Sequence, residues 1–544
     1  MSSGRYAIGV DFGTESGRAL LLDLESGAEA AISEVRYPHG VIDRELPGAG
    51  VRLAPDWALQ HPDDWVAVLE TAIPEVLGRV PAAREAVVGL GVDFTSCTVL
   101  PVTGDGAPLI AQERWRGRRH AWPKLWKHHA AQPVADRLNE VAAERAEPFL
   151  SRYGGRISSE WYFPKLIEVW LEDREIYDAC DAFIEATDWI VWHLTGIERR
   201  QICTAGYKAM WSPQEGLPPA DYFEAAYPGF DRPAAKLGSD FAPLGASAGT
   251  LRADLAARLG IPGEVTVAVG NVDSFVSVPG AGVESPGTFV MVVGTSICDL
   301  VVDPREVRLP GITGVVRDGI LPGLYGYEAG QAAVGDMLAW FLETLAPPGS
   351  ELPAFERAAE AIGPGETGLL ALDWWNGNRT ILADADLSGA LFGMTLQTTR
   401  EEIYRALLES IAFGNRRIIE NFDEHGVGLE AIVACGGIAE KSPLTMQLLA
   451  DTSGLGVSVP DSSQVPARGA ALFGAVAAGH FPDIASAIAA TRPGAARRYE
   501  PDAARKAVYD RVYAIYRSLY ERLGRTEADL LHGLKRIYTE RRAS

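Results

Sequence analysis

The sequence has few cysteines and no long uninterrupted apolar run. Its five cysteines are scattered over 544 residues, odd in number and never spaced as CxxC, so they support neither a disulfide framework nor a cysteine-based zinc site. No stretch approaches the ~18 consecutive apolar residues that a membrane-spanning helix needs. The opening residues, MSSGRYAIGVDFG, lack the features of a secretory signal. We therefore expect a cytoplasmic protein without a membrane partner.

Basic residues are also fewer than acidic residues. Fifty Lys and Arg face 72 Asp and Glu, a net charge of −22. Such an excess repels phosphate backbones, so nucleic acid is not an expected partner. The GxGxxG and Walker A patterns are missing, which leaves the Rossmann and P-loop modes of nucleotide binding unsupported. Small anionic ligands stay compatible with this composition, because a local set of backbone N–H groups can hold a phosphate in an acidic protein.

One pattern occurs twice, about half a chain apart. Residues 6–23 and 288–303 each place an apolar run on both sides of a short glycine-containing turn, the pattern of a β-hairpin. Helical periodicity is clear in residues 401–422. Further strand-like runs lie at 87–94, 265–273 and 432–440. The alternation predicts a duplicated α/β unit whose mixed sheets are covered by helices on both faces.

Composition along the chain also predicts domain boundaries. A first domain is predicted over residues 1–282, with a helical insertion at about 112–175 that is rich in Arg, Lys, His and Trp. A second domain follows over residues 283–485, after the Pro- and Gly-rich stretch 278–287. The remaining residues, 486–544, are predicted to form a charged helical tail.

The two hairpin turns are candidate phosphate sites. Gly13, Thr14 and Ser16 offer backbone N–H groups and hydroxyls with little side-chain bulk, and Gly294 and Thr295 repeat this arrangement in the second half. An ordinary hairpin would use the same turn residues. Two such turns in duplicated halves favour a clamp around a nucleotide. Asp11, at the end of the first strand, is placed to bind Mg²⁺ through its carboxylate.

Two further positions have both a functional and a structural interpretation. Asp273 follows an apolar strand and precedes a helix start, so it is either an N-cap or a general base that removes a proton from a substrate hydroxyl. Gly436 and Gly437 end another strand; they permit close approach of a flat ligand such as adenine, or tight strand–helix packing. Local sequence does not decide between these readings.

Several motifs occur in an order that resembles the FGGY family of carbohydrate kinases. The resemblance covers about residues 5–485, and its sugar-side motifs resemble those of members that act on L-ribulose. The motifs are DFGTESGRALLLD, GVDFTSCTVLPV, HAWPKLWKHHAAQ, TAGYKAMW, GNVDSF, VVGTSICDL, YGYEAGQAAVGD and CGGIAEKSPLTMQLLADTSG. The resemblance implies an α/β fold of two duplicated ribonuclease H-like (actin-like ATPase) domains flanking a deep cleft.

The resemblance also implies roles for individual residues. Asp273 is the expected general base, and Asp11 and Asp273 are the expected Mg²⁺ ligands. The expected sugar contacts are Ser96, Trp126, Lys208, Asp273 and Glu328. The expected ATP contacts are Gly13, Thr14, Ser16, Arg18, Gly294, Thr295, Gly436 and Gly437. Ser96 stands at a position where small residues vary within the subgroup.

The expected reaction is ATP-dependent phosphorylation of L-ribulose at its 5-hydroxyl, in L-arabinose catabolism. A related possibility is a kinase for another ketopentose or pentitol, such as D-ribulose, xylulose or ribitol. A conformational ATPase of the actin or chaperone type would share the fold, although no β-rich substrate domain is evident after residue 485. A homodimer is an expected assembly.

Overall fold

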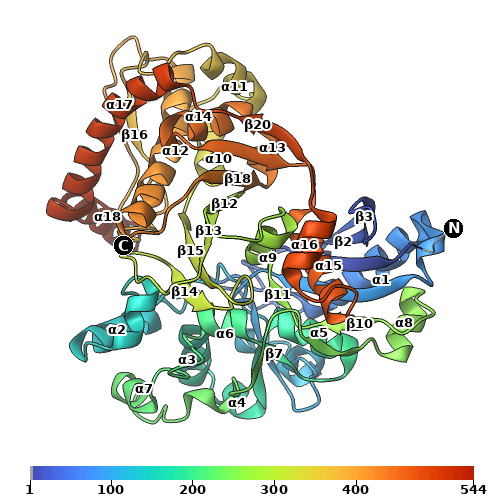
Figure 1. The fold of residues 1–544 in the computed structure, drawn as a ribbon. Helices are drawn as coiled ribbons and strands as arrows, with labels where there is room; N and C mark the ends of the chain where they lie inside the picture. The colour runs from blue at the N-terminus through green and yellow to red at the C-terminus, as the bar shows by residue number, and fades with distance from the viewer. Residues whose placement is uncertain (1–3, 544) are drawn as a thin grey trace.

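The computed structural model describes residues 4–543, which form two lobes that are each built on a central sheet (Figure 1). In the view of Figure 1 the second lobe lies above the first. Among the described residues, no helix combines the length and hydropathy needed to cross a bilayer. The five cysteines are free thiols, and four of them are buried.

The first sheet has the strand order β3-β2-β1-β4-β10-β9, with β11 also paired to β4. Its hairpin is antiparallel, whereas β4 runs parallel to β1. Buried aliphatic residues on both faces explain why these segments form interior strands. The strands are β1 (Tyr6–Phe12), β2 (Ser16–Asp23), β3 (Glu29–Arg36), β4 (Val87–Phe94), β9 (Ser247–Thr250), β10 (Thr266–Ala268) and β11 (Asn271–Val272).

The second sheet repeats this topology in the order β14-β15-β13-β12-β18-β19-β20. The hairpin β12–β13 is antiparallel, and β18 lies parallel beside β12 as β4 does beside β1. The duplicated α/β unit predicted from the two hairpins is therefore confirmed. The strands are β12 (Thr288–Val293), β13 (Ile297–Asp303), β14 (Gly314–Arg317), β15 (Tyr325–Gln331), β18 (Ala431–Cys435), β19 (Gly456–Pro460) and β20 (Ala495–Tyr499).

Helices cover both faces of each sheet. One face of the first sheet packs on α1, α5 and α8, and one face of the second packs on α10, α12, α14 and α17. The two remaining faces share a core with α9, α15 and α16, which lie between the sheets. These helices are α1 (Pro62–Arg79), α5 (Ala186–Thr195), α8 (Ala253–Leu259), α9 (Asp273–Gly280), α10 (Gly335–Thr344), α12 (Arg400–Glu424), α14 (Pro443–Ser453), α15 (Val465–Ala477), α16 (Ile484–Thr491) and α17 (Ala503–Glu521).

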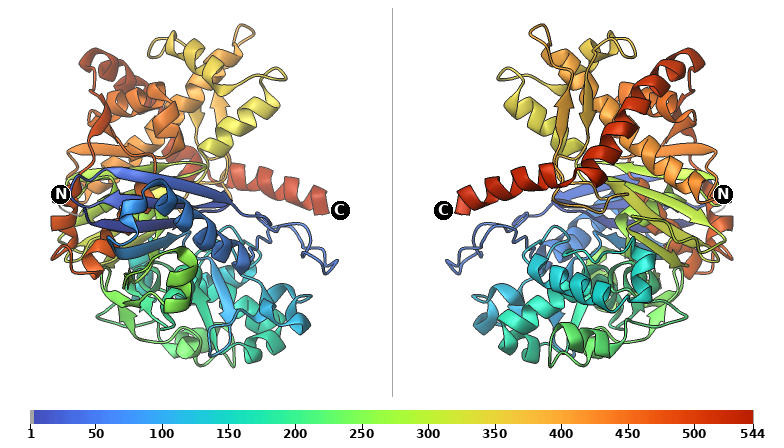
Figure 2. Two further views of the ribbon diagram at one scale, coloured as in Figure 1. Left: turned by 90° about the vertical axis from the view of Figure 1, so that its right-hand side faces the viewer. Right: turned by 90° about the vertical axis from the view of Figure 1, so that its left-hand side faces the viewer.

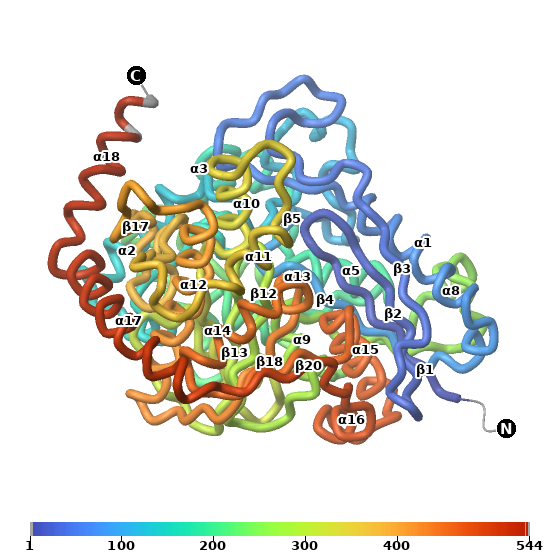
Figure 3. Tube along the Cα trace, turned by 90° about the horizontal axis from the view of Figure 1, so that it is seen from above, coloured from blue at the N-terminus to red at the C-terminus, as the bar shows by residue number. Residues whose placement is uncertain are grey.

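Helix α15 lies directly against the first sheet, although it comes late in the chain (Figure 3). Glycines make this approach close: a Cβ on Gly9 would lie 1.7 Å from the carbonyl oxygen of Ala467, and one on Gly91 would lie 1.9 Å from that of Ala470. A domain division at residues 283–485 therefore separates α15 from the sheet on which it packs. The predicted domain bounds remain a prediction, and the contact between α15 and the first sheet joins the two predicted domains.

A largely helical layer below the first sheet forms its own core. The predicted insertion at 112–175 covers part of it. Residues 109–121 form short 3₁₀ turns, regular helix begins at 132, and the layer continues beyond 175. Its helices are α2 (Gln132–Glu144), α3 (Tyr162–Glu172), α4 (Arg174–Ala179) and α7 (Ala220–Ala226). Helix α6 (Ile202–Lys208) lies beside them, but its side chains belong to the core that contains α9, α15 and α16. Smaller elements are β5 (Val99–Val102), β6 (Ala182–Glu185), β7 (Arg200–Gln201), β8 (Phe241–Ala242), β16 (Leu370–Leu372), β17 (Ala390–Phe392), α11 (Leu352–Glu360) and α13 (Gly437–Lys441).

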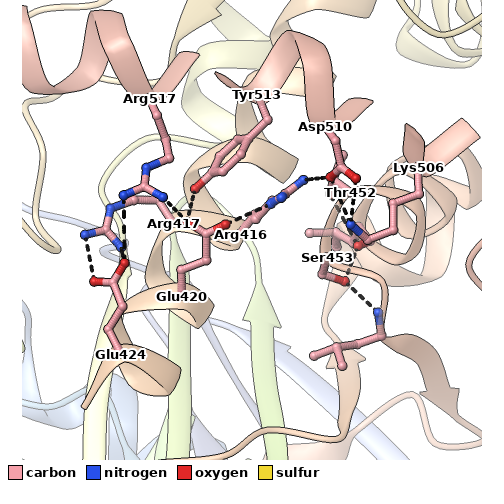
Figure 4. Close-up of polar contacts among 12 residues, drawn as sticks. Arg416, Arg417, Glu420, Glu424, Thr452, Ser453, Lys506, Asp510, Tyr513 and Arg517 are labelled. Atoms are coloured by element: carbon pink, nitrogen blue, oxygen red, sulfur yellow. Dashed lines mark hydrogen bonds and ion pairs between the residues drawn. The ribbon is translucent and has the colours of Figure 1, made fainter. Parts of the chain in front are cut away.

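The C-terminal segment is not wholly helical, because β20 adds an edge strand to the second sheet. Helix α17 is held on α12 by charged and polar contacts: Asp510 pairs with Arg416 at 2.6 Å, and the hydroxyl of Tyr513 donates to Glu420 at 2.7 Å (Figure 4). The last helix, α18 (Asp529–Ala543), leaves the second lobe and projects from the body as an arm (Figure 2).

Candidate active site

Three aspartates meet at the carboxyl edge of the first sheet. Asp11 and Asp93 lie opposite each other at the ends of the parallel strands β1 and β4. Strand β11 pairs with β4 on its other side, and Asp273 follows it as the first residue of α9. Because neighbouring parallel strands end at one edge, chain segments some 260 residues apart in sequence bring three carboxylates together.

The base of the first hairpin is tied to this edge. Arg18 donates from Nη1 to Oδ2 of Asp11 at 3.0 Å and from Nη2 to the hydroxyl of Ser16 at 3.1 Å. That hydroxyl in turn donates to Oε1 of Glu34 at 2.8 Å. Ser16 is buried, so its hydroxyl is bound to Arg18 and Glu34 and supports the turn. The structure thus brings Asp11, Ser16 and Arg18 together at the base of the first hairpin.

Asp93 is a site residue that the sequence analysis did not assign. It is fully buried, and neither carboxylate oxygen has a hydrogen-bond donor among the residues that the structure describes. Burial raises its pKa well above the usual value, with further contributions from the charges of Asp11 and Asp273. The signal was present in the sequence: 87–94 is an apolar run that ends in an acid, as the run before Asp11 does.

Asp273 is the most favourably placed candidate for a general base. It is half-buried, and its Oδ1 accepts from the backbone N–H of Ser274 at 2.6 Å. The N-cap of α9 is Val272, and no side chain caps it, so the simple capping interpretation does not apply. Burial raises the pKa of Asp273 to about 7, and the charge of Asp11 adds to the rise. A carboxylate with this pKa can exchange a proton near neutral pH.

Lys208 and Glu328 form a buried ion pair between the lobes. Lys208 ends α6 in the first lobe, and its Nζ lies 3.0 and 2.8 Å from the two carboxylate oxygens of Glu328 on β15. Burial is the largest single effect and lowers the pKa of Lys208, but the charge and hydrogen bond of Glu328, together with the charges of Cys97 and Cys298, leave it raised. Lys208 also lowers the pKa of Asp273 against the effect of burial. The pair therefore lies close to the carboxylate edge and can bind hydroxyl groups there.

A cavity of about 780 Å³ opens between the two lobes. Both hairpin turns line it, through Thr14 and Thr295, and so does the half-buried Trp126. The indole Nε1 of Trp126 donates to the hydroxyl of Thr14 at 3.0 Å, which fixes the first turn beside the cavity. The carbonyl of Thr295 accepts from the backbone N–H of Val334 at 2.9 Å, just before α10 begins. The two predicted phosphate turns thus border one space.

The remaining predicted residues lie at the margin of this arrangement. Gly436 follows β18 with φ +94°, and a Cβ there would lie 2.7 Å from the carbonyl oxygen of Val293, so glycine is needed for the backbone. Gly437 and Gly294 face open space, where a Cβ would meet no close contact. Ser96 is half-buried in the turn after β4. The structure does not place these four among the residues that line the cavity.

The Trp- and His-rich segment divides between core and cavity. His128 is buried, with Nε2 2.9 Å from Glu168, which also pairs with the buried Lys124 at 2.9 Å. His129 instead lines the cavity. The two histidines therefore do not face one ligand.

The residues at the carboxylate edge fit a divalent cation with a nucleotide. Asp93 offers two buried oxygens without donors, and Asp11 lies beside it. Mg²⁺ prefers such oxygens and keeps several of its waters. The backbone groups and hydroxyls of the two turns fit phosphate oxygens.

Comparison with known proteins agrees with this geometry. Residues 289–478 match the C-terminal domain of the FGGY family of carbohydrate kinases. A ribulokinase of Anoxybacillus flavithermus is 48% identical over 98% of this chain and 97% of its own. A ribulokinase of Mycolicibacterium smegmatis is 46% identical over 96% of this chain and 94% of its own. The chain belongs to the FGGY family of carbohydrate kinases. The family resemblance inferred from the sequence motifs is thereby confirmed.

Solved structures of other FGGY kinases share the fold. A xylulose kinase from Rhodospirillum rubrum matches with a TM-score of 0.79 at 24% identity, over 97% of this chain and 100% of its own. A glycerol kinase from Plasmodium falciparum, solved with ADP, matches with a TM-score of 0.75 at 15% identity, over 95% of this chain and 98% of its own. The expected fold class, two duplicated actin-like domains flanking a cleft, is confirmed.

Proposed function

We propose that this carbohydrate kinase transfers the γ-phosphoryl group of ATP to the 5-hydroxyl of L-ribulose. The observation that carries the proposal is the position of Asp273, beside Asp11 and Asp93 at the carboxylate edge and within electrostatic range of the Lys208–Glu328 pair. The sugar is named from the ribulokinases that are 46–48% identical over nearly the whole chain.

Each side chain of the site has a separate role in phosphoryl transfer. Asp273 accepts the proton of the attacking hydroxyl, and Lys208 and Glu328 bind neighbouring hydroxyls with opposite hydrogen-bonding roles. Trp126 offers a flat apolar face to the sugar. Mg²⁺, when bound at Asp11 and the neighbouring aspartates, neutralises phosphate charge. Since such a transfer depends on positioning and charge more than on covalent help, these groups suffice.

The nucleotide is proposed to lie between the turns and the end of β18. Gly13, Thr14, Gly294 and Thr295 face its phosphates. The adenine lies near Gly437, where the surface is open, while Gly436 keeps the backbone close to β12. Ser96 is proposed to contact the sugar from the turn after β4. Arg18 supports this end through Asp11.

A substrate panel tests the proposed reaction. ADP release is measured with Mg²⁺ and ATP on L-ribulose, D-ribulose, xylulose, ribitol and glycerol. We expect kcat/KM to be highest for L-ribulose, with ATP hydrolysis in the absence of sugar lower by at least about 100-fold, since the base then lacks its hydroxyl. A preference for another polyol would replace the sugar assignment. Sugar-independent hydrolysis at the full rate would favour a conformational ATPase.

The projecting helix α18 supports a homodimer. Four large apolar side chains recur along it at helical spacing, and all are more than half exposed. They are Leu530 at 59%, Leu534 at 66%, Ile537 at 60% and Tyr538 at 57%. The helix also carries the exposed Arg536 in a chain of net charge −22. An apolar, basic arm on an acidic body is complementary to a second copy of the same chain.

We therefore expect dimerisation to depend on this face. Light scattering after size exclusion, at micromolar concentration, is expected to give twice the chain mass of 58.4 kDa. The double substitution Leu534→Glu and Ile537→Glu is expected to give the single-chain mass with unchanged activity. Leu396→Glu, at a fully exposed position elsewhere, is the control and keeps the dimer. A wild-type monomer, or an unaffected double variant, contradicts the assignment.

A further inference from the structure

Arg379 is a basic side chain of the second lobe that faces the cavity between the lobes. It lies in the segment between β16 and β17 and is half-buried. The cavity that it lines is also bordered by Thr14 and Thr295 of the two hairpin turns. The backbone next to it is fixed, because the hydroxyl of Thr380 accepts from the N–H of Gly330 on β15 at 3.1 Å. Arg379 is therefore held beside the phosphate turns.

The same guanidinium also lies near the sugar end of the site. Burial raises the pKa of the Cys298 thiol; Glu328 adds to this rise, while Lys208 and Arg379 oppose it. Cys298 is on β13 and lies opposite Gly330 of β15. Gly330 is two residues from Glu328 along the same strand. Arg379 thus stands within electrostatic range of the position where phosphates and sugar must meet.

Arg379 has no acidic partner in the described part of the chain. No carboxylate oxygen there lies within 4.0 Å of its guanidinium. Asp384, which lines the cavity in the same segment, is paired with His532 of α18 at 2.8 Å. Asp299 is fully buried without a hydrogen-bond donor, and burial raises its pKa well above the usual value although Arg379 opposes the rise. No ion pair joins Asp299 to Arg379 in the described part of the chain, so Asp299 does not compensate the arginine at contact distance.

An uncompensated, half-buried cation carries a desolvation cost that a bound anion offsets. In a chain with a net charge of −22, such a cation does not reflect a generally basic surface. Its planar fork of donors matches the oxygens of a phosphate group. The remaining polar groups of the segment on the cavity wall, Asn376 and Asn378, carry no charge.

We propose that Arg379 binds the γ-phosphoryl group of ATP and neutralises the charge that builds up on it during transfer. This inference rests on the proposed kinase function but not on the identity of the sugar. The attacking hydroxyl oxygen forms a bond to the γ-phosphorus while the bond from that phosphorus to the bridging oxygen breaks. The hydroxyl proton goes to Asp273, and ADP leaves with the bridging oxygen. Arg379 donates hydrogen bonds throughout and transfers no proton.

Nucleotide binding without sugar tests the contact directly. Titration calorimetry compares a non-hydrolysable ATP analogue with ADP, each with Mg²⁺. In Arg379→Ala we expect the analogue to bind about 10-fold more weakly and ADP to bind within about twofold of wild type, because only the analogue has the third phosphate. We expect kcat to fall by about 100- to 1000-fold, as for other groups that stabilise transition-state charge, with KM for the sugar within about threefold. Added guanidinium is expected to restore part of the rate.

Two further variants make the result specific. Arg357→Ala removes an exposed arginine of α11, away from the cavity, and should leave both nucleotide affinities unchanged. Arg379→Lys keeps the charge without the fork and should fall between wild type and Arg379→Ala; it also serves if the alanine variant does not fold. Equal weakening of analogue and ADP, or a raised KM for the sugar with unchanged kcat, would overturn the proposal. Failure of every sugar in the panel would reject the proposed reaction yet leave this comparison valid.

Discussion

Replacement of Asp273 by Asn is expected to lower kcat by about 10³-fold, within the range for loss of a general base. The amide has nearly the same shape and can still accept from the N–H of Ser274, as the carboxylate does at 2.6 Å. It cannot take the proton of the attacking hydroxyl. Sugar and ATP affinities, measured by calorimetry, should therefore stay within a few-fold of wild type. A variant that keeps more than a tenth of the wild-type kcat would remove the base assignment.

The pH profile gives a second readout of the same residue. Burial raises the pKa of Asp273 to about 7, so the carboxyl is protonated and inactive below that pH and ionised above it. We expect kcat/KM for the sugar to rise with pH through a midpoint at about 7 or lower, since a bound cation favours the ionised form. This limb should vanish in Asp273→Asn. A wild-type rate that falls between pH 6 and 8 would contradict the assignment.

Gly91→Ala is expected to destabilise the protein severely by adding one methyl group. The new Cβ would lie 1.9 Å from the carbonyl oxygen of Ala470 on α15. The backbone fixes the positions of both atoms, so no change of rotamer can relieve the contact. We expect a loss at or above the upper end of the ~1–3 kcal/mol for overpacked cores. This corresponds to a fall in Tm of about 6–12 °C or more for a lobe of this size.

Gly117→Ala is the matched control for this effect. The same methyl group there would meet nothing within 4 Å, so Tm by differential scanning calorimetry should stay within about 1–2 °C of wild type. Insolubility of Gly91→Ala with a normal control would also agree with close packing of α15. Equal Tm values for the two variants would show that the helix and sheet can separate at no cost.

Local sequence patterns predicted the parts of the site that depend on nearby residues. Both hairpins, with Gly13 and Gly294 in their turns, follow from apolar runs around short glycine connections. The strand before Asp273 was recognisable for the same reason, although it breaks into β10 and β11. Each of these patterns spans only about ten residues on either side of a turn. Over such a short segment the backbone has few alternative conformations.

Contacts between distant segments could not be predicted from patterns. Lys208 and Glu328 are 120 positions apart, and no local pattern links them. The part played by Asp93 depends on the pairing of β4 with both β1 and β11. Arg379 lies in a segment without helix or strand, so no helical or strand periodicity in the sequence marks its position.

The place of α15 also has a consequence for the order in which the chain is synthesised. The face of the first sheet that carries Gly9 and Gly91 is covered by residues near 467–474. A ribosome has therefore made more than four-fifths of the polypeptide before that face can be closed. Until then the early strands expose an apolar surface to solvent and to chaperones. The first lobe is complete as a folding unit only when the second lobe has nearly emerged.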